Sequence, residues 1–206
     1  MIKELDDILF HSLRIFKKYG IKRITMDDLS REMGISKKTL YRFIENKVDL
    51  LEKVIDYENK KIDELFNRYE ETGENSIDVL FNLSFDVIRM LKEINPVFTY
   101  DLQKIYPELC REHFEQKRKK TFENIKKNLL KGIEEGVYRK DIDVEMVALL
   151  YVQNMENVMN PDFLYGPSFS ASGLFKVMFE NHIRSIANEK GMKYFEEKIK
   201  DLNFNI

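Results

Sequence analysis

One short stretch of the chain concentrates side chains that can bind an anionic polymer. Lys37 and Tyr41 lie four residues apart, as do Lys38 and Arg42, so each pair shares one side of a helix. Ammonium and guanidinium groups bind phosphates and also hydrogen-bond the edges of bases. This spacing indicates contact with nucleic acid. The alternative is a solvated lysine face on an ordinary helical hairpin, and composition alone does not separate the two.

Eight side chains form the predicted binding site for double-stranded DNA. Four are expected to face base edges or nearby phosphates: Lys37, Lys38, Thr39 and Arg42. The other four are expected to fix the module on the phosphate backbone: Thr25, Ser36, Tyr41 and Lys47.

Two short helices that meet at a tight turn must position these side chains. Thr25 can cap the first helix, and Ser36 can cap the second. Gly34, which has no Cβ, reaches left-handed backbone angles cheaply and supplies the turn. Leu40 and Ile44 share one side of the second helix and are expected to pack. The pattern therefore predicts a helix-turn-helix whose second helix presents cations.

Charge is distributed unevenly along the 206 residues. The whole chain has 34 Lys and Arg against 36 Asp and Glu, a formal net charge of −2. Residues 14–47 contain ten Lys or Arg and four Asp or Glu, a net of +6, so the remainder carries −8. A basic module on an acidic body is the distribution expected for phosphate contact.

The rest of the sequence predicts an all-α protein. Glycine (8) and proline (4) are scarce, and no segment shows the strict alternation of a half-buried strand. Apolar residues at helical spacing predict further helices over about 2–19, 46–69, 76–94, 97–106 and 107–135. Two more are expected, one from Asp141 or Asp143 to Met159 and one between Ser170 and Ile186. A terminal helix is expected to begin at Gly191. A linker is expected over residues 71–75 and a loop from Asn160 to Ser170.

Enzymatic activity and a bound cofactor are not expected. The sequence has no glycine-rich phosphate loop, no paired-histidine zinc motif and no nucleophile elbow. Cys110 and His113 lie three residues apart and could address one metal ion, but two ligands do not close a site. A packed thiol and an ordinary polar histidine are the favoured alternative, and no metal site is predicted.

The sequence predicts a cytoplasmic protein without a membrane span. Its single cysteine excludes an internal disulfide and agrees with a reducing compartment. The longest apolar run, Met146 to Val152, is too short to cross a membrane, and the N-terminus is too charged for a signal peptide.

Aromatic and methionine residues are frequent in the body of the chain. For any single residue a place in the packed core is favoured, but as a set they could also line an adaptable pocket for an apolar or aromatic small molecule. The candidates are Phe66, Phe81, Phe85, Met90, Tyr100, Tyr106, Phe114, Phe122, Tyr151 and Met155.

The last two long helices before Gly191 are apolar around more than the one face that a monomer core needs. This surplus predicts a homodimer. The residues expected at its interface are Leu149, Val152, Leu174, Phe175, Met178, Phe179 and His182.

The first fifty residues resemble the TetR family of bacterial transcriptional regulators. The matching residues, all at the spacing of the family, are Phe16, Gly20, Thr25, Met26, Leu29, Ser30, Gly34, Ile35, Ser36, Lys37, Thr39, Leu40, Tyr41, Lys47 and Leu50. Ile44 stands where the family usually has phenylalanine, and Lys38 stands where a small residue is frequent. The second departure prevents the base specificity of relatives from being carried over.

The resemblance implies an N-terminal three-helix helix-turn-helix DNA-binding domain, residues 1–48, joined to a C-terminal helical bundle, residues 49–206, for ligand binding and dimerisation. The predicted function is a homodimeric transcriptional repressor that a small-molecule effector releases from its operator. The alternative is a helical ligand-binding or interaction protein with a vestigial helix-turn-helix. The intact Gly34, Tyr41 and Lys47 argue against that alternative.

Overall fold

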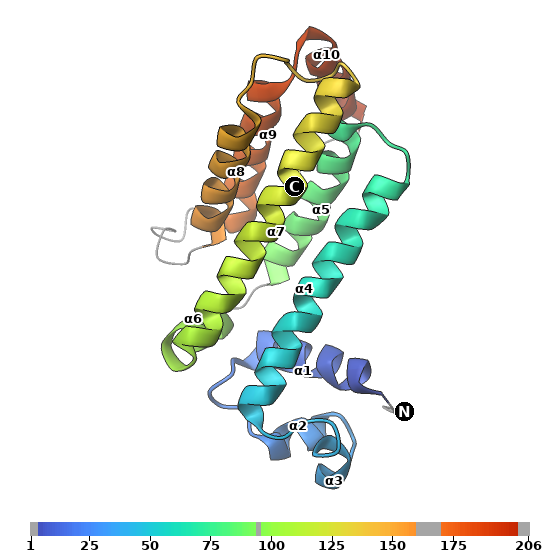
Figure 1. The fold of residues 1–206 in the computed structure, drawn as a ribbon. Helices are drawn as coiled ribbons and strands as arrows, with labels where there is room; N and C mark the ends of the chain where they lie inside the picture. The colour runs from blue at the N-terminus through green and yellow to red at the C-terminus, as the bar shows by residue number, and fades with distance from the viewer. Residues whose placement is uncertain (1–3, 94–95, 160–169, 202–206) are drawn as a thin grey trace. The chain divides into compact units, whose positions relative to one another are not determined.

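The structure is a computed structural model that describes residues 4–93, 96–159 and 170–201. In these ranges the chain forms ten α-helices and no strand. Figure 1 labels the helices along the ribbon. The helices are α1 (Leu5–Tyr19), α2 (Met26–Glu32), α3 (Lys37–Leu40), α4 (Lys47–Glu71), α5 (Ser76–Glu93), α6 (Pro96–Ile105), α7 (Pro107–Glu134), α8 (Val144–Met159), α9 (Ala171–Ile186) and α10 (Glu189–Asp201). The predicted all-α fold is confirmed.

The chain packs as two compact units. Unit 1 comprises residues 1–64 and 93–117, and unit 2 comprises residues 65–92 and 118–206. Unit 1 therefore contains the whole of the predicted DNA-binding domain, 1–48, together with later segments of the chain. The functional boundary at residue 48 stays a prediction, because compact units describe packing and not function.

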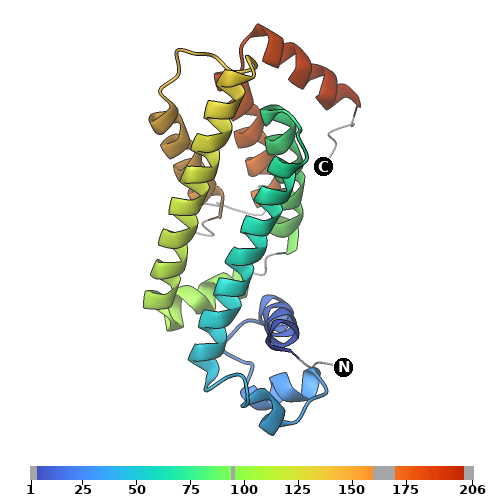
Figure 2. The same ribbon diagram turned by 45° about the vertical axis from the view of Figure 1, so that its right-hand side comes forward.

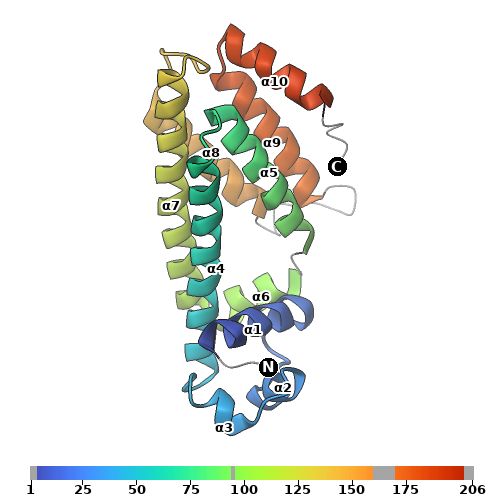
Figure 3. The ribbon, with the colours of Figure 1, turned by 90° about the vertical axis from the view of Figure 1, so that its right-hand side faces the viewer.

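Unit 1 is built around α1, which lies between α6 and the α2–α3 pair in Figure 3. Its core consists of buried apolar side chains from every helix of the unit: Ile8, Leu9, Phe16, Ile21, Leu29, Leu40, Ile44, Leu50, Leu51, Val54, Ile55, Phe98, Leu102 and Cys110. Asn46 starts α4, since its side-chain oxygen accepts the backbone N–H groups of Val48 and Asp49. Because α6 contributes Phe98 and Leu102, the core around the helix-turn-helix includes residues about eighty positions away in sequence.

Unit 2 has an aromatic core shared by α5, α9 and α10. The Phe81 ring meets Phe85, Phe179 and Phe195 edge-on, with ring centroids 5.1, 6.1 and 6.2 Å apart. Edge-to-face contacts of this kind add stability beyond the burial of their area. Figures 2 and 3 show α10 lying over the end of α9 and the start of α5. Tyr194 of α10 donates a 2.7 Å hydrogen bond to the carboxylate of Asp78 in α5.

Three local expectations differ from the structure or lie outside it. The helix that was expected to reach Ile44 ends at Leu40 and continues as turns. Gly191 lies inside α10 and does not begin it, because Asn188 caps the helix by accepting the Gly191 N–H at 3.0 Å. The loop predicted from Asn160 to Ser170 falls outside the described residues except for Ser170.

Candidate nucleic-acid interface

The helix-turn-helix of unit 1 is held by a cap at each helix and a glycine between them. The Thr25 hydroxyl accepts the Asp28 N–H at 3.1 Å, and the Asp28 carboxylate accepts the Thr25 N–H at 3.0 Å, which completes a capping box before α2. Gly34 has a φ of 65° in the turn. The Ser36 hydroxyl accepts the Thr39 N–H at 3.0 Å and caps α3. The predicted caps and turn are confirmed, while contact of Thr25 and Ser36 with DNA stays a prediction.

The cations of α3 and the turn after it lie on the surface. Lys38, Tyr41 and Arg42 are exposed. Lys37 pairs with Asp27 of α2, and both side chains are more than half exposed. An ion pair this exposed contributes little to stability, so a phosphate can replace Asp27 at small cost. Ser36 is exposed as well, so five of the eight predicted site residues are accessible on the short segment 36–42.

Lys47 is more enclosed than its neighbours in the predicted site. Its ammonium donates hydrogen bonds to the backbone carbonyl oxygens of Ile21, at 2.6 Å, and Ile24. Burial lowers the pKa of Lys47, and the charges of Asp101 and Asp28 oppose that shift. Two of its three N–H donors therefore hold the loop between α1 and α2, and one remains for the predicted phosphate contact.

The sequence interpretation did not identify three residues beside this loop. Lys22 and Arg23 are exposed just before α2 and add two cations to the same end of unit 1. Asp101 of α6 is buried, and its carboxylate accepts the backbone N–H groups of Ile21 and Lys22, each at 2.8 Å. Lys22 and Arg23 are among the ten basic residues of the segment 14–47, so the charge of that segment was a signal for them. No local pattern links Asp101 to a loop about eighty residues earlier in the sequence.

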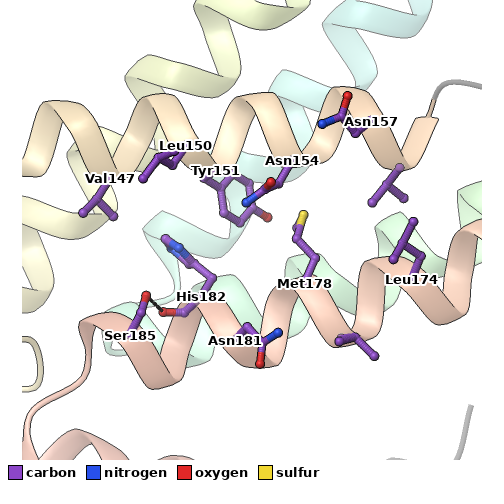
Figure 4. Close-up of a pocket in the computed structure, with 12 residues that line it drawn as sticks. Val147, Leu150, Tyr151, Asn154, Asn157, Leu174, Met178, Asn181, His182 and Ser185 are labelled. Carbon is purple, nitrogen blue, oxygen red and sulfur yellow. Dashed lines mark hydrogen bonds between the residues drawn. The ribbon is translucent and has the colours of Figure 1, made fainter. Parts of the chain in front are cut away.

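A groove of about 540 Å³ lies between α8 and α9 in unit 2 (Figure 4). No charged side chain is among the described residues that line it: Val147, Leu150, Tyr151, Asn154, Asn157, Val158, Leu174, Val177, Met178, Asn181, His182 and Ser185. Leu150 and Val177 are more than half exposed, which is unusual for apolar side chains that gather on one face. Figure 4 shows Leu150, Tyr151 and Met178 projecting into the space between the two helices.

His182 is the most unusual polar residue of the groove. It is buried, its Nε2 atom has no hydrogen-bond partner in the described part of the chain, and its ring meets Tyr151 edge-on with centroids 4.6 Å apart. Burial lowers the pKa of His182 from 6.5 to about 4. The neutral imidazole therefore predominates near pH 7, with one nitrogen left for a partner.

The residues predicted for a dimer interface divide between this groove and the core. Leu174, Met178 and His182 line the groove, and Leu149 is exposed on α8 outside it. Val152, Phe175 and Phe179 are buried inside unit 2, where a partner could reach them only if the unit rearranged. The physical reason is that α8 and α9 are apolar on two faces, and the inner face contains the larger rings.

The ten residues of the predicted ligand pocket lie in both units. Tyr100, Tyr106 and Phe114 belong to unit 1, where Tyr100 is exposed and the other two pack against the core. The other seven belong to unit 2, and of these Tyr151 alone lines the groove between α8 and α9. The pocket stays a prediction.

Two classes of feature do not occur in the described ranges. Across residues 4–93, 96–159 and 170–201, no three His, Cys, Asp or Glu side chains gather in a way that could hold a metal ion. In the same ranges no helix is both long enough and apolar enough to cross a membrane. Cys110 is buried in the core of unit 1, and this burial raises the pKa of its thiol.

The helix-turn-helix also matches a known family. The model of the bacterial regulatory proteins of the tetR family matches residues 8–54, which span α1, α2, α3 and the start of α4. Residues 8–54 thus form the N-terminal segment that is typical of the TetR family. The predicted resemblance to the TetR family is thereby confirmed, and the match lies on the helix-turn-helix segment of unit 1.

Proteins similar to this chain include a curated repressor. KstR2, an HTH-type transcriptional repressor from Mycobacterium tuberculosis, is 23% identical over 147 residues, which cover 68% of this chain and 72% of KstR2. A transcriptional regulator from Cytophaga hutchinsonii superposes with a TM-score of 0.74 at 19% identity, covering 89% of this chain and 98% of that one. The structure of KstR2, described as a ketosteroid transcriptional regulator, superposes with a TM-score of 0.52 at 19% identity, covering 92% and 98%. The structural matches show that the fold is shared.

Proposed function

We propose that this TetR-family protein is a homodimeric transcriptional repressor that binds operator DNA and leaves it when a small-molecule effector binds. The carrying observation is the helix-turn-helix, in which a capped α3 and the turn after it present Lys37, Lys38, Tyr41 and Arg42 to solvent. Such a segment suits the major groove, where cations can reach base edges between two rows of phosphates. The regulatory direction follows KstR2, which is a repressor.

A second copy of the chain is the partner that best suits the groove between α8 and α9. The part of the groove lining that the structure describes has no charged residue. It combines exposed Leu150 and Val177 with amide groups and with the Nε2 atom of His182, which has no hydrogen-bond partner among the described residues. An occupant must therefore bring apolar surface and uncharged hydrogen-bonding groups. The same face of another copy brings both, as a two-fold symmetric interface requires. A dimer also supplies the two recognition helices, about 34 Å apart, that successive major grooves demand.

The proposed effector is an apolar or aromatic small molecule. Unit 2 is rich in aromatic side chains, among them Phe81, Phe85 and Tyr151, and apolar sites between helices commonly bind such ligands. KstR2 is described as a ketosteroid transcriptional regulator, and another structural neighbour is described as a gamma-butyrolactone receptor. Ketosteroids and gamma-butyrolactones are both uncharged types of molecule. For release, the effector must bind the DNA-free arrangement more tightly than the DNA-bound one.

Selection of genomic DNA by the purified protein tests the proposed function. Sheared DNA from the source genome is captured at moderate salt, sequenced and compared with capture by a variant that carries Lys38→Ala and Arg42→Ala. We expect one or a few sites with two-fold symmetry, lost in the variant. Recovery of fragments without a common site, equal for wild type and variant, would reject sequence-specific DNA binding.

A further inference from the structure

The loop between α1 and α2 is held from two sides by charged groups. On one side the Asp101 carboxylate of α6 accepts the N–H groups of Ile21 and Lys22, both at 2.8 Å. On the other side the Lys47 ammonium, at the start of α4, donates to the carbonyl oxygens of Ile21 and Ile24. Hydrogen bonds that involve a charged group are shorter and stronger than neutral ones. The peptide groups of this loop are therefore fixed by α6 and α4 together.

The approach of α6 to this loop is close enough to require a glycine. Gly20 has a φ of 81°, and a Cβ placed there would lie 2.7 Å from Cγ1 of Val97 and 2.9 Å from Oδ2 of Asp101. Both distances are well inside van der Waals contact. At Gly20 the backbone of the loop thus packs directly against the Val97 and Asp101 side chains of α6, with no side chain of its own between them.

The loop that is held in this way leads directly into the DNA-binding helices. Thr25 begins the capping box of α2 one residue after Ile24, and α2 meets α3 through the turn at Gly34. A change in the position of the loop must therefore move α2, and α3 moves with it.

We propose that Asp101 is a positioning residue for DNA binding, through which α6 sets the orientation of the helix-turn-helix. This inference rests on the proposed function and extends it to a residue far beyond the matched segment 8–54. Asp101 touches no DNA in this account. It raises the fraction of molecules whose loop, α2 and α3 are in the binding arrangement, and the apparent affinity for DNA scales with that fraction.

A positioning role and simple charge attraction predict opposite changes in DNA affinity when Asp101 is replaced by Asn. Asp101→Asn removes one negative charge from the unit that meets DNA, so long-range attraction alone would strengthen binding. Loss of the positioning role would weaken it. We expect affinity for the captured operator to fall in the order wild type, Asp101→Asn, Asp101→Ala, with about a tenfold loss for the alanine variant and an unchanged dependence on salt, because the phosphate contacts stay the same in number.

A second pair of variants perturbs the same contact without a change in charge. Gly20→Ala should push α6 from the loop and weaken DNA binding in the same direction. Gly73→Ala is its matched control, because Gly73 also has a positive φ, 73°, but a Cβ there would meet nothing within 4 Å. Asp86→Asn is the control for Asp101→Asn, since Asp86 is also a buried carboxylate but belongs to unit 2.

Amide hydrogen exchange supplies a readout that is independent of DNA. Exchange at the Ile21 and Lys22 amides should accelerate at least about tenfold in Asp101→Ala and stay unchanged in Asp86→Asn. If the wild type binds the operator and both Asp101 variants bind it equally well or more tightly, the positioning role of Asp101 is overturned while the proposed function stands. Unchanged exchange at the Ile21 and Lys22 amides in Asp101→Ala would also overturn that role. A wild-type protein that binds no DNA would instead reject the proposed function, and this role with it.

Discussion

The ammonium of Lys47 lies 2.6 Å from the backbone carbonyl oxygen of Ile21. Replacing Lys47 by Met keeps most of the aliphatic stem and removes the charged donor from two carbonyl groups. The Ile21 carbonyl then keeps only the 3.3 Å hydrogen bond from the Ile24 N–H, and the Ile24 carbonyl loses its bond from Lys47. We expect the free energy of unfolding to fall by about 1–3 kcal/mol, the range for removing a partner of an enclosed polar group. Chemical denaturation measures this loss. Lys60→Met, at an exposed position of α4, is the control. Equal free energies of unfolding for the two variants would show that the Lys47 hydrogen bonds do not stabilise the fold.

The exposed cations of α3 should read DNA sequence. Lys38→Ala should change preference among operator variants by about 1–3 kcal/mol if its ammonium contacts a base edge. Competition between duplexes that differ at one base pair measures this preference. Lys22→Ala, which removes an exposed cation outside α3, should weaken binding to all of these duplexes alike. A uniform loss for Lys38→Ala as well would assign that residue to the phosphates.

The groove between α8 and α9 should close against a second subunit. Leu150→Asp or Val177→Asp places a charge on its exposed apolar surface and should convert dimers to monomers at micromolar concentration, because an unpaired charge opposes burial. Light scattering coupled to size exclusion measures the mass. Leu130→Asp, on an exposed apolar position of α7, should leave the dimer intact. Monomeric wild type, or variants that stay dimeric, would show that this face is not the interface.

Acid should destabilise the fold partly through His182. Burial lowers its pKa from 6.5 to about 4, so the unfolded chain binds the proton more readily than the folded one. Its contribution is fully present above about pH 6.5 and is lost as the pH falls towards 4, by roughly 3 kcal/mol for the whole shift. His182→Leu should therefore lose less unfolding free energy over this interval than wild type does. If the unfolding free energies of wild type and His182→Leu fell in parallel between pH 6.5 and 4, a buried neutral imidazole at His182 would be contradicted.

The helix-turn-helix could be predicted from sequence because its signals are local. A cap residue needs only the backbone N–H groups two and three positions later, so Thr25 and Ser36 indicated where α2 and α3 begin. Gly34 indicated the turn through its own backbone conformation. The family resemblance covers this segment for the same reason, since the signals repeat at fixed spacing.

Contacts between distant segments could not be predicted in the same way. Asp101 is one of 36 acidic residues, and only folding brings it against the Ile21 amide. On α9 the apolar residues cover two faces, so periodicity did not separate Phe175, which is buried, from Val177, which is exposed. The end of α3 at Leu40 was also missed, because helical spacing continued into turns that keep similar backbone contacts.

Affinity for the captured operator as a function of salt tests the central claim most directly. Fluorescence anisotropy would compare the operator duplex with an unrelated duplex of equal length, for wild type and for the double variant Lys38→Ala, Arg42→Ala. We predict that wild type prefers the operator by at least about a thousandfold, that log affinity falls linearly with log salt, and that the variant loses the preference and part of the slope. Equal wild-type affinity for both duplexes, or a variant that binds like wild type, would contradict a DNA-reading α3.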